Sequence, residues 1–343
     1  MAEGVRSDAF QRLKIDSLSD PSCYPHPVGR VETIETHLSW VFLAGAFAYK
    51  LKKPVIYDHL DLRSLDSRYE NSIREVALNR RLAPDVYVGA IPLVMTPSRV
   101  LRLECEGETV DWLVRMHRLP GDRMLDRMLD AGRATRADVE RVIRLLATFY
   151  RRATPAVTRA EDYDAALRRT LASNREALTD PAFEACADGL DDGPAALLDA
   201  QQSFLGDHAD VFARRVERGR IVEGHGDLRP EHVCLTSPPV IYDCLDFSRA
   251  LRVADAADEL SFLALECERL GFDWVDPVIW QCYAEAAGDR PPRVLVAFYK
   301  SVRACTWARL ALGRTRELAR EDWQPWLEHA NSYLKLAGAH LPQ

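Results

Sequence analysis

The pattern of apolar positions changes character once along the chain. From residue 31 to residue 118, short apolar and aromatic runs are separated by turns, which is typical of strands. The runs "WVFLAG" and "FAYKLK" flank Gly45 and predict a hairpin, and "GAIPLVM", "RVLRLECEG" and "TVDWLVRMHRL" predict three further strands. Between these groups, "LDSRYENSIREVALNRRLAP" predicts a helix, with apolar residues such as Tyr69 and Ile73 at helical spacing.

After "RLPGD" the pattern becomes helical. The stretch "TRADVERVIRLLATFYRRA" opens with Thr135 and Asp138 as an N-terminal capping pair, and "PAALLDAQQSFLGDHADVFARRVERG" ends at Gly219 as a C-cap. One polar interruption, "VEGHGDLRPEHVCL" followed by "VIYDCLDF", predicts a hairpin embedded among helices. The fold class is therefore α+β, with a sheet-rich lobe over residues 1–117 and a larger helical lobe over residues 118–343. The first part of the smaller lobe, about 30 residues, is expected to be an extension.

Composition narrows the function classes. The 343 residues are 47% hydrophobic and 28% charged, enough to build two lobes with a substantial core. No apolar run approaches the roughly 18 residues of a membrane helix, and the polar start lacks a signal-peptide block, so a cytoplasmic location without a membrane partner is expected. The eight cysteines include no CxxC pair and predict reduced, mostly buried thiols. A net charge of −7 without a basic stripe argues against nucleic acid as a partner and suits a cationic small substrate.

The predicted hairpin concentrates the polar chemistry. Gly226, between His225 and Asp227, lets the backbone turn tightly and places Asp227 on a stiff loop at a strand end. The returning strand is expected to bring Asp243 and Asp246 back towards Asp227. Carboxylates that meet repel one another unless a cation lies between them. Mg²⁺, which takes carboxylates together with phosphate oxygens, is the simplest such cation.

These motifs resemble a known family. "HGDLRPEH" followed by "VIYDCLDF" resembles the catalytic and metal-binding loops of aminoglycoside phosphotransferase-like kinases, which are relatives of choline kinases. The resemblance extends over roughly residues 30 to 310 and implies a protein kinase-like bilobal fold with ATP and Mg²⁺ as cofactors. It also implies transfer of the γ-phosphate to a hydroxyl of a small molecule, such as an amino sugar, an aminoglycoside or a related alcohol. Some relatives with a similar "YKLKKPV" segment carry an added P-loop domain, but this sequence contains no GxxxxGK[ST], so one nucleotide site is implied.

The resemblance assigns roles to the hairpin residues. Asp227 resembles the catalytic base that accepts the proton of the acceptor hydroxyl, and His225 resembles the residue that braces the loop. Asp243, directly after "VIY", is the first choice for the metal-binding aspartate, and Asp246 is either a second ligand or the true equivalent. His232 stands where the family has a metal-binding asparagine. His232 is thus a candidate metal ligand by position, but imidazole is a poor Mg²⁺ ligand, so three alternatives stay open: one metal ion suffices, His232 contacts phosphate directly, or activity is reduced.

The resemblance also assigns residues of the smaller lobe. Lys50 resembles the lysine that grips phosphate, and Lys52 shares its face because side chains alternate along a strand, whereas Lys53 points away. Glu75 resembles the helix glutamate that orients this lysine, and Glu70, one turn earlier, competes for that role.

Adenine and acceptor sites are implied by the same resemblance. Adenine would lie against "LVRMHRLPG", where the backbone of three consecutive residues would read its edge: Met116, His117 and Arg118. The acceptor would lie near the later helices, with four candidate contacts: Asp258, Glu259, Arg303 and Trp307. Acidic residues there would suit an amino group on the acceptor.

Two other functions fit parts of the sequence. One is a catalytically impaired, kinase-like nucleotide-binding protein with a regulatory role. The other is a metal-dependent hydrolase in which His225, Asp227, His232 and an aspartate of the second strand bind Zn²⁺ or Mn²⁺. A metal site of that kind would not need the sheet lobe, the lysine strand or the Pro-Gly hinge predicted near Pro120–Gly121. The sequence therefore favours a small-molecule kinase.

Overall fold

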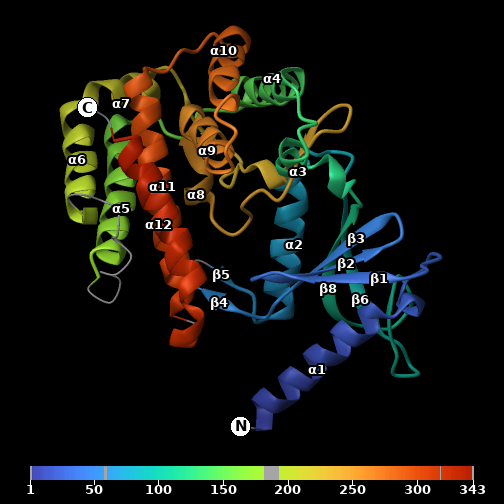
Figure 1. Cartoon of the computed structure of the whole chain (residues 1–343). Helices are drawn as coiled ribbons and strands as arrows, with labels where there is room; N and C mark the ends of the chain where they lie inside the picture. The colour runs from blue at the N-terminus through green and yellow to red at the C-terminus, as the bar shows by residue number, and fades with distance from the viewer. Residues whose placement is uncertain (1, 58–59, 181–192, 317, 342–343) are drawn as a thin grey trace. The chain divides into compact units, whose positions relative to one another are not determined.

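The computed structural model describes residues 2–57, 60–180, 193–316 and 318–341, which form two compact units. Unit 1 comprises Met1–Met124 and Cys234–Arg249, and unit 2 comprises Leu125–Val233 and Ala250–Gln343. Each unit therefore combines two stretches of chain that are distant in sequence. The predicted α+β fold class is confirmed (Figure 1).

A six-stranded sheet forms the centre of unit 1, in the order β1-β2-β3-β8-β6-β7, and every neighbouring pair is antiparallel. Its strands are β1 (Val31–Glu35), β2 (Ser39–Ala44), β3 (Phe47–Lys52), β6 (Tyr87–Met95), β7 (Leu101–Leu103) and β8 (Glu108–His117). The predicted hairpin of β2 and β3 turns at Gly45, whose φ of 61° lies in the left-handed region that favours glycine. A small pair, β4 (Ile56–Tyr57) and β5 (Leu60–Asp61), follows the hairpin.

Helix α1 (Ala2–Ser19) occupies the expected N-terminal extension and was not predicted as a helix. Leu18 near its end is fully buried with the apolar residues of the sheet. Its Lys14 donates to Asp111 of β8 at 2.7 Å, and Arg68 donates to the other oxygen of the same carboxylate, also at 2.7 Å. Because all three side chains are buried, this ion pair network fastens the extension to the sheet.

The predicted helix of unit 1 is present as α2 (Leu65–Asn79), which lies against β6 and β8. Ser64 caps it by accepting a hydrogen bond from the amide of Ser67 at 3.0 Å. Its apolar Tyr69 and Ile73 are exposed, whereas Val76 of the same periodic set is buried, so the apolar periodicity marks the packed face only in part. The buried positions are mostly polar: Arg68, Asn71, Ser72, Glu75, Val76 and Asn79.

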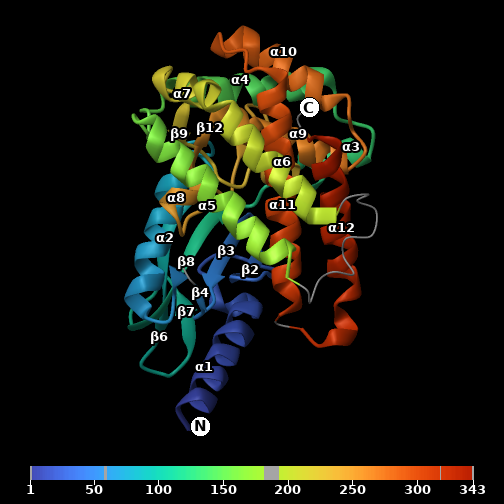
Figure 2. The same cartoon turned by 90° about the vertical axis from the view of Figure 1, so that its left-hand side faces the viewer.

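Unit 2 is mainly helical, and its two last long helices, α11 and α12, run side by side (Figure 2). Thr135 and Asp138 form the predicted capping box of α4, whereas the stretch that ends at Gly219 forms two helices, with His208 between them. The helices of this part of the chain are α3 (Leu125–Asp130), α4 (Arg136–Arg152), α5 (Ala160–Leu178), α6 (Gly193–Asp207), α7 (Ala209–Glu217), α8 (Arg249–Arg252), α9 (Ala256–Arg269), α10 (Val275–Ala287), α11 (Arg293–Thr315) and α12 (Gln324–Ala339).

The predicted hairpin consists of β10 (Val233–Cys234) and β11 (Val240–Ile241). The strand that precedes His225 is β9 (Ile221–Glu223), and it pairs with β12 (Val253–Asp255) instead. Asp227 therefore lies on the β9–β10 loop in unit 2, whereas Asp243 and Asp246 follow β11 in unit 1. The assignment of a nucleotide lobe to residues 1–117 and an acceptor lobe to residues 118–343 stays a prediction.

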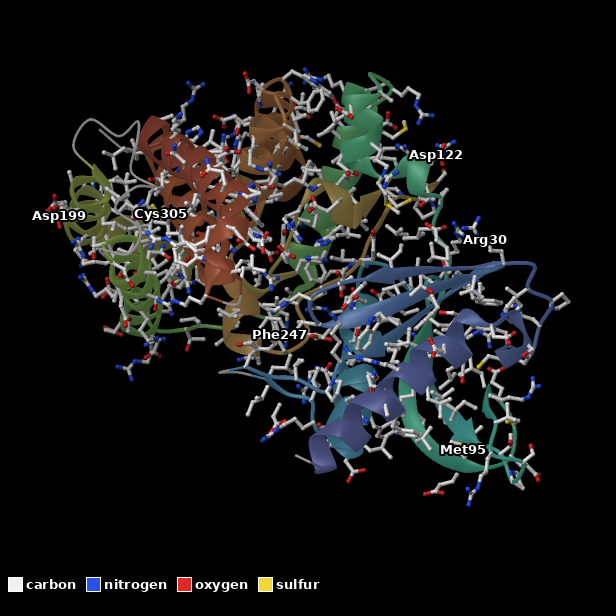
Figure 3. The ribbon with its side chains drawn as sticks, turned by 60° about the horizontal axis from the view of Figure 1, so that its bottom comes forward. Arg30, Met95, Asp122, Asp199, Phe247 and Cys305 are labelled. Atoms are coloured by element: carbon white, nitrogen blue, oxygen red, sulfur yellow. The ribbon has the colours of Figure 1, made fainter. Side chains whose placement is uncertain are left out.

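The cysteines agree with the expected reduced, mostly buried thiols. Those that the structure describes form no disulfide, and all of them except Cys105 are buried. Cys305 lies on α11 within the helical unit (Figure 3). Cys186 lies outside the described residues. Among the helices in the described ranges, none is long and apolar enough to cross a membrane.

Candidate active site

Unit 1 joins two lysines, one glutamate and two aspartates in a single ionic network. Lys50 Nζ lies 2.9 Å from Glu75 Oε1 and 2.8 Å from Asp243 Oδ1. Lys52 Nζ lies 2.5 Å from Glu75 Oε2 and 2.6 Å from Asp246 Oδ2. The carboxylate of Glu75 thus holds both lysines, which lie on the same face of β3 because they are two positions apart.

Lys53 and Glu70, the neighbours of Lys50 and Glu75 that the sequence also offered for these roles, lie outside this network. Lys53 pairs with the exposed Glu35 at 2.5 Å, and its ammonium lies 4.7 Å from the centre of the Trp40 ring. Glu70 is exposed on α2. The structure therefore brings Lys50, Glu75 and Asp243 together, and it adds Lys52 and Asp246 to the same network.

The network shifts the pKa values of Lys50, Lys52 and Asp246. Burial alone lowers the pKa of Lys50, but the carboxylates of Asp243 and Glu75 outweigh burial and raise it well above its ordinary value. Burial raises the pKa of Asp246, yet the ammonium groups of Lys52 and Lys50 reverse the direction and lower it. Both lysines are thus held charged, so the network presents fixed positive charges beside the two aspartates.

Helix α2 and strand β6 also fix the backbone after β11. The amide of Cys244 donates to Asn79 Oδ1 at 2.8 Å, and the amide of Asp243 donates to Tyr87 Oη at 3.3 Å. Asp243 itself has a φ of 59°, a conformation that L-residues adopt rarely and at a cost. Sequence reasoning missed Asn79 and Tyr87. Asn79 could have been found because it lies four residues after Glu75, on the same face of α2.

An apolar patch of unit 1 lies on the same strands as the network. Ala48 and Met116 are buried there, and five partly buried residues pack against them: Val41, Leu43, Leu119, Val240 and Tyr242. A cavity of about 380 Å³ beside Leu43 is lined by Arg30, Glu32 and Arg118 as well. Figure 3 labels Arg30 at the start of this strand region and Phe247 on the segment that follows Asp246.

Two of the backbone groups expected to face adenine are already paired within unit 1. The amide of His117 donates to the carbonyl of Val86 at 2.8 Å, and the amide of Arg118 donates to the carbonyl of Ala46 at 2.9 Å. The His117 and Arg118 side chains are exposed, and the Met116 side chain is buried in the apolar patch.

In unit 2, Glu259 holds the loop that carries Asp227. The amide of Gly226 donates to Glu259 Oε1 at 2.5 Å, and Tyr150 Oη donates to Glu259 Oε2 at 3.0 Å. Gly224 also approaches the Glu259 carboxylate so closely that a Cβ atom at this position would clash with it. Glu259, expected near the acceptor, is thus buried at the start of α9. His225, expected as a brace, is buried in the same loop, and its ring centre lies 6.0 Å from that of His232.

The carboxylate of Asp227 is paired with an arginine two residues further along. Arg229 Nε lies 3.0 Å from Asp227 Oδ1, and Arg229 Nη2 donates to Asp227 Oδ2 at 3.1 Å. His232 Nδ1 lies 2.8 Å from the carbonyl oxygen of Asp227. Because a carbonyl can only accept, Nδ1 is the protonated nitrogen of this ring.

The acceptor candidates Arg303 and Trp307 on α11 both contact the ring of Phe262. Asp258 and Arg303 make a bidentate pair, with Nε to Oδ1 and Nη2 to Oδ2 both at 2.8 Å. Burial raises the pKa of Asp258, and Arg303 opposes that rise. Trp307 stacks on Phe262 with ring centres 5.6 Å apart, and the Arg229 guanidinium lies 4.7 Å from the centre of its ring.

Metal-binding chemistry is best matched in unit 1. Asp243 and Asp246 supply carboxylate oxygens, the ligands that Mg²⁺ prefers, and the Asp243 side chain is 44% exposed. In the described part of the chain, no three His, Cys, Asp or Glu side chains are grouped so that they could hold a metal ion. The His225, Asp227 and His232 set considered for a hydrolase is therefore not assembled as a ligand group.

No protein family model matches the chain. The curated relatives include uncharacterized proteins of Mycobacterium bovis and Mycobacterium tuberculosis, each 31% identical over 296 residues. The aligned part covers 85% of this chain but only 57% of each relative, so the chain spans little more than half of their length.

Solved structures resemble the chain over nearly its whole length. A choline/ethanolamine kinase family protein from Mesorhizobium loti has a TM-score of 0.54 and 14% identity, covering 96% of this chain and 95% of its own. The choline kinase LicA from Streptococcus pneumoniae has a TM-score of 0.52 and 13% identity, covering 96% of this chain and 99% of its own. At such identities the likeness concerns the fold, and it confirms the fold implied by the sequence motifs. The chain has the protein kinase-like fold that these choline kinase structures share.

Proposed function

We propose that the protein is an ATP- and Mg²⁺-dependent phosphotransferase that transfers the γ-phosphate to a hydroxyl group of a small molecule. The observation that carries this proposal is the network of Lys50, Lys52 and Glu75 with Asp243 and Asp246 in unit 1. Its fixed ammonium groups suit phosphate oxygens, and its aspartates suit a hard divalent cation. The fold is the one that choline kinase structures share, and LicA has been solved in complex with AMP.

In the proposed function, unit 1 binds the nucleotide. The apolar patch around Ala48 and Met116 offers a surface for adenine, and Lys50 extends from the same strand as Ala48. Asp243, the more exposed of the two aspartates, would hold the metal ion, and Asp246 stays tied to Lys52. Bound there, Mg²⁺ would neutralise charge on the phosphate oxygens.

Unit 2 supplies the base. In the proposed reaction, an oxygen of the acceptor forms a bond to the γ-phosphorus as the bond between this phosphorus and the β–γ bridging oxygen breaks. ADP leaves with the electron pair of that bond, and the acceptor proton passes to the Asp227 carboxylate. Glu259 supports this step by holding the Gly226 backbone, because a loose loop would not keep the base within hydrogen-bond distance of the hydroxyl.

The negative net charge of the chain favours an acceptor that carries a positive charge. The net charge of −7 suits an acceptor that carries an amino or ammonium group, whereas the carboxylates of Asp227, Glu231 and Asp258 in unit 2 are each paired with an arginine. We propose an amino sugar, an aminoglycoside or a related amino alcohol, with Trp307, Asp258 and Arg303 as the candidate contacts.

A screen for ADP release tests this function. The full chain would be incubated with Mg²⁺-ATP and with amino sugars, aminoglycosides, choline-like alcohols and simple sugars. We expect acceptor-dependent ADP release with at least one class, and we expect Asp227→Asn to abolish it while the affinity for nucleotide changes little. Wild-type turnover by Asp227→Asn would contradict the assigned base.

The second candidate function is a nucleotide-binding regulator with impaired catalysis. His232 favours it, because this residue replaces the metal-binding asparagine of the family and bonds to the backbone of Asp227. This function predicts thermal stabilisation by Mg²⁺-ATP without ADP release for any acceptor. The same screen, followed by thermal unfolding, therefore separates the two candidates.

A further inference from the structure

The loop of unit 2 that carries Asp227 already contains a cation. The Arg229 guanidinium lies 3.0 Å and 3.1 Å from the two oxygens of Asp227, and its third nitrogen lies 2.5 Å from Glu231 Oε1. One guanidinium thus pairs with two carboxylates of the loop. In protein kinases the corresponding loop instead helps to hold a second divalent cation, through an asparagine.

Arg229 is held firmly in this position. Its guanidinium lies 4.7 Å from the centre of the Trp307 ring, and Trp307 is itself stacked on Phe262. Burial lowers the pKa of Arg229, but Asp227 and Glu231 outweigh burial and raise it. A planar cation that rests on an aromatic face and pairs with two carboxylates loses little entropy when it acts on a third group.

His232 adds to this arrangement. Its Nδ1 donates to the carbonyl of Asp227 at 2.8 Å, which fixes the ring, and its Nε2 lies 3.5 Å from Arg229 Nη2. The nitrogen that would have to bind a metal ion therefore faces a guanidinium. A divalent cation at this nitrogen would be repelled by Arg229, and imidazole is in any case a poor ligand for Mg²⁺.

We propose that the Arg229 guanidinium takes the place of the second metal ion, so that the nucleotide complex of this protein holds one divalent cation rather than two. This inference rests on the proposed function. It assigns the metal ion to Asp243 of unit 1 and the positive charge of the catalytic loop to Arg229, and it makes His232 a positioning residue. An arginine cannot dissociate, so nucleotide binding should not require Mg²⁺ beyond the amount that complexes the nucleotide.

The number of bound cations tests the proposal directly. Mn²⁺ would be titrated into the full chain with saturating adenylyl imidodiphosphate, and bound Mn²⁺ would be counted by electron paramagnetic resonance. We expect one protein-bound Mn²⁺ per bound nucleotide, and Asp243→Asn should weaken its binding at least about tenfold. Two Mn²⁺ per nucleotide would overturn this inference and leave the proposed function intact. A failure of the nucleotide to bind would overturn both.

Two variants test the part played by Arg229. His232→Asn restores the amide ligand but keeps the guanidinium, so it should still bind one Mn²⁺. The double variant Arg229→Gln/His232→Asn removes the competing cation as well and should bind two. If His232→Asn alone gained a second Mn²⁺, or if the double variant stayed at one, Arg229 would not be the excluding group. Thermal unfolding of each variant checks that it is folded, and the wild-type count stands independently of both.

Discussion

Glu75 is the residue on which the unit 1 network depends most, because its single carboxylate pairs with both Lys50 and Lys52. Glu75→Gln would leave two largely buried lysines with one carboxylate each, and breaking a buried ionic group in this way costs about 3–5 kcal/mol. We expect a loss of this size in the free energy of unfolding, measured with urea. Glu70→Gln, on the exposed side of the same helix, is the matched control and should change stability by less than about 0.5 kcal/mol. Equal effects of the two substitutions would show that the network contributes nothing.

Asp246 should make stability depend on pH in a defined window. Its pKa is lowered in the folded protein, where Lys52 and Lys50 outweigh burial, so the unfolded chain binds the proton more readily. The stabilisation from Asp246 is therefore fully present above its unfolded value of 3.8 and is lost as the pH falls below that value through the folded pKa. We expect the difference in unfolding free energy between wild type and Asp246→Asn to be constant near pH 7 and to shrink below about pH 4. A difference that grew on acidification would contradict this direction.

At the residue scale, motif resemblance identified candidate site residues but not the residues that hold them in place. Lys50, Glu75 and Asp243 were picked out from short motifs, and the structure places them in contact. Asn79, Tyr87 and Arg229 were missed, because each acts through a partner that is far away in sequence or through a neighbour on a folded loop. A motif shows which residues a reaction needs, whereas the groups that hold them depend on tertiary packing.

At the element scale, α2 shows why apolar periodicity can mislead. Its Tyr69 and Ile73 are exposed, and its buried face carries Arg68, Glu75 and Asn79, which pair with the sheet and with the segment after β11. Burial of such a face is favourable only when every polar group finds a partner, and the sequence alone does not reveal those partners. Capping patterns were more reliable, as the box at the start of α4 shows, because they depend on residues three positions apart.

The turn between β9 and the Asp227 loop offers an element-scale prediction. A Cβ atom on Gly224 would clash with the buried carboxylate of Glu259, which also accepts from the Gly226 amide. Gly224→Ala should therefore lower the unfolding temperature and reduce ADP release, because Glu259 must move away from the loop. Gly206→Ala in α6 is the matched control. A Cβ atom there meets nothing within 4 Å, and alanine should stabilise the helix by about 0.5–1 kcal/mol. The prediction fails if Gly224→Ala unfolds at the wild-type temperature.

At the scale of the whole molecule, each compact unit is assembled from two distant stretches of chain. Asp243 and Asp246 belong with the sheet of unit 1, more than a hundred residues away in sequence, whereas Asp227 belongs with the helices of unit 2. The order of strands and helices along the sequence predicted the two kinds of region. It did not predict that the segment after β10 would belong to unit 1, because this depends on contacts such as those of Cys244 with Asn79 and of Ile241 with Leu82.

The division into two units predicts which amides nucleotide binding should protect from hydrogen exchange. If the nucleotide binds to unit 1, adenylyl imidodiphosphate with Mg²⁺ should slow amide hydrogen exchange in two separate stretches, β2–β3 and Cys234–Arg249, because both contribute to the same network. The amides of α11 and α12, in the core of unit 2, serve as the internal reference and should change little. Asp243→Asn should remove the protection of both stretches together, since Lys50 would lose one of its partners and the metal ion would lose a ligand. Protection confined to one stretch would mean that the two segments do not act as one nucleotide site, even though they form one compact unit.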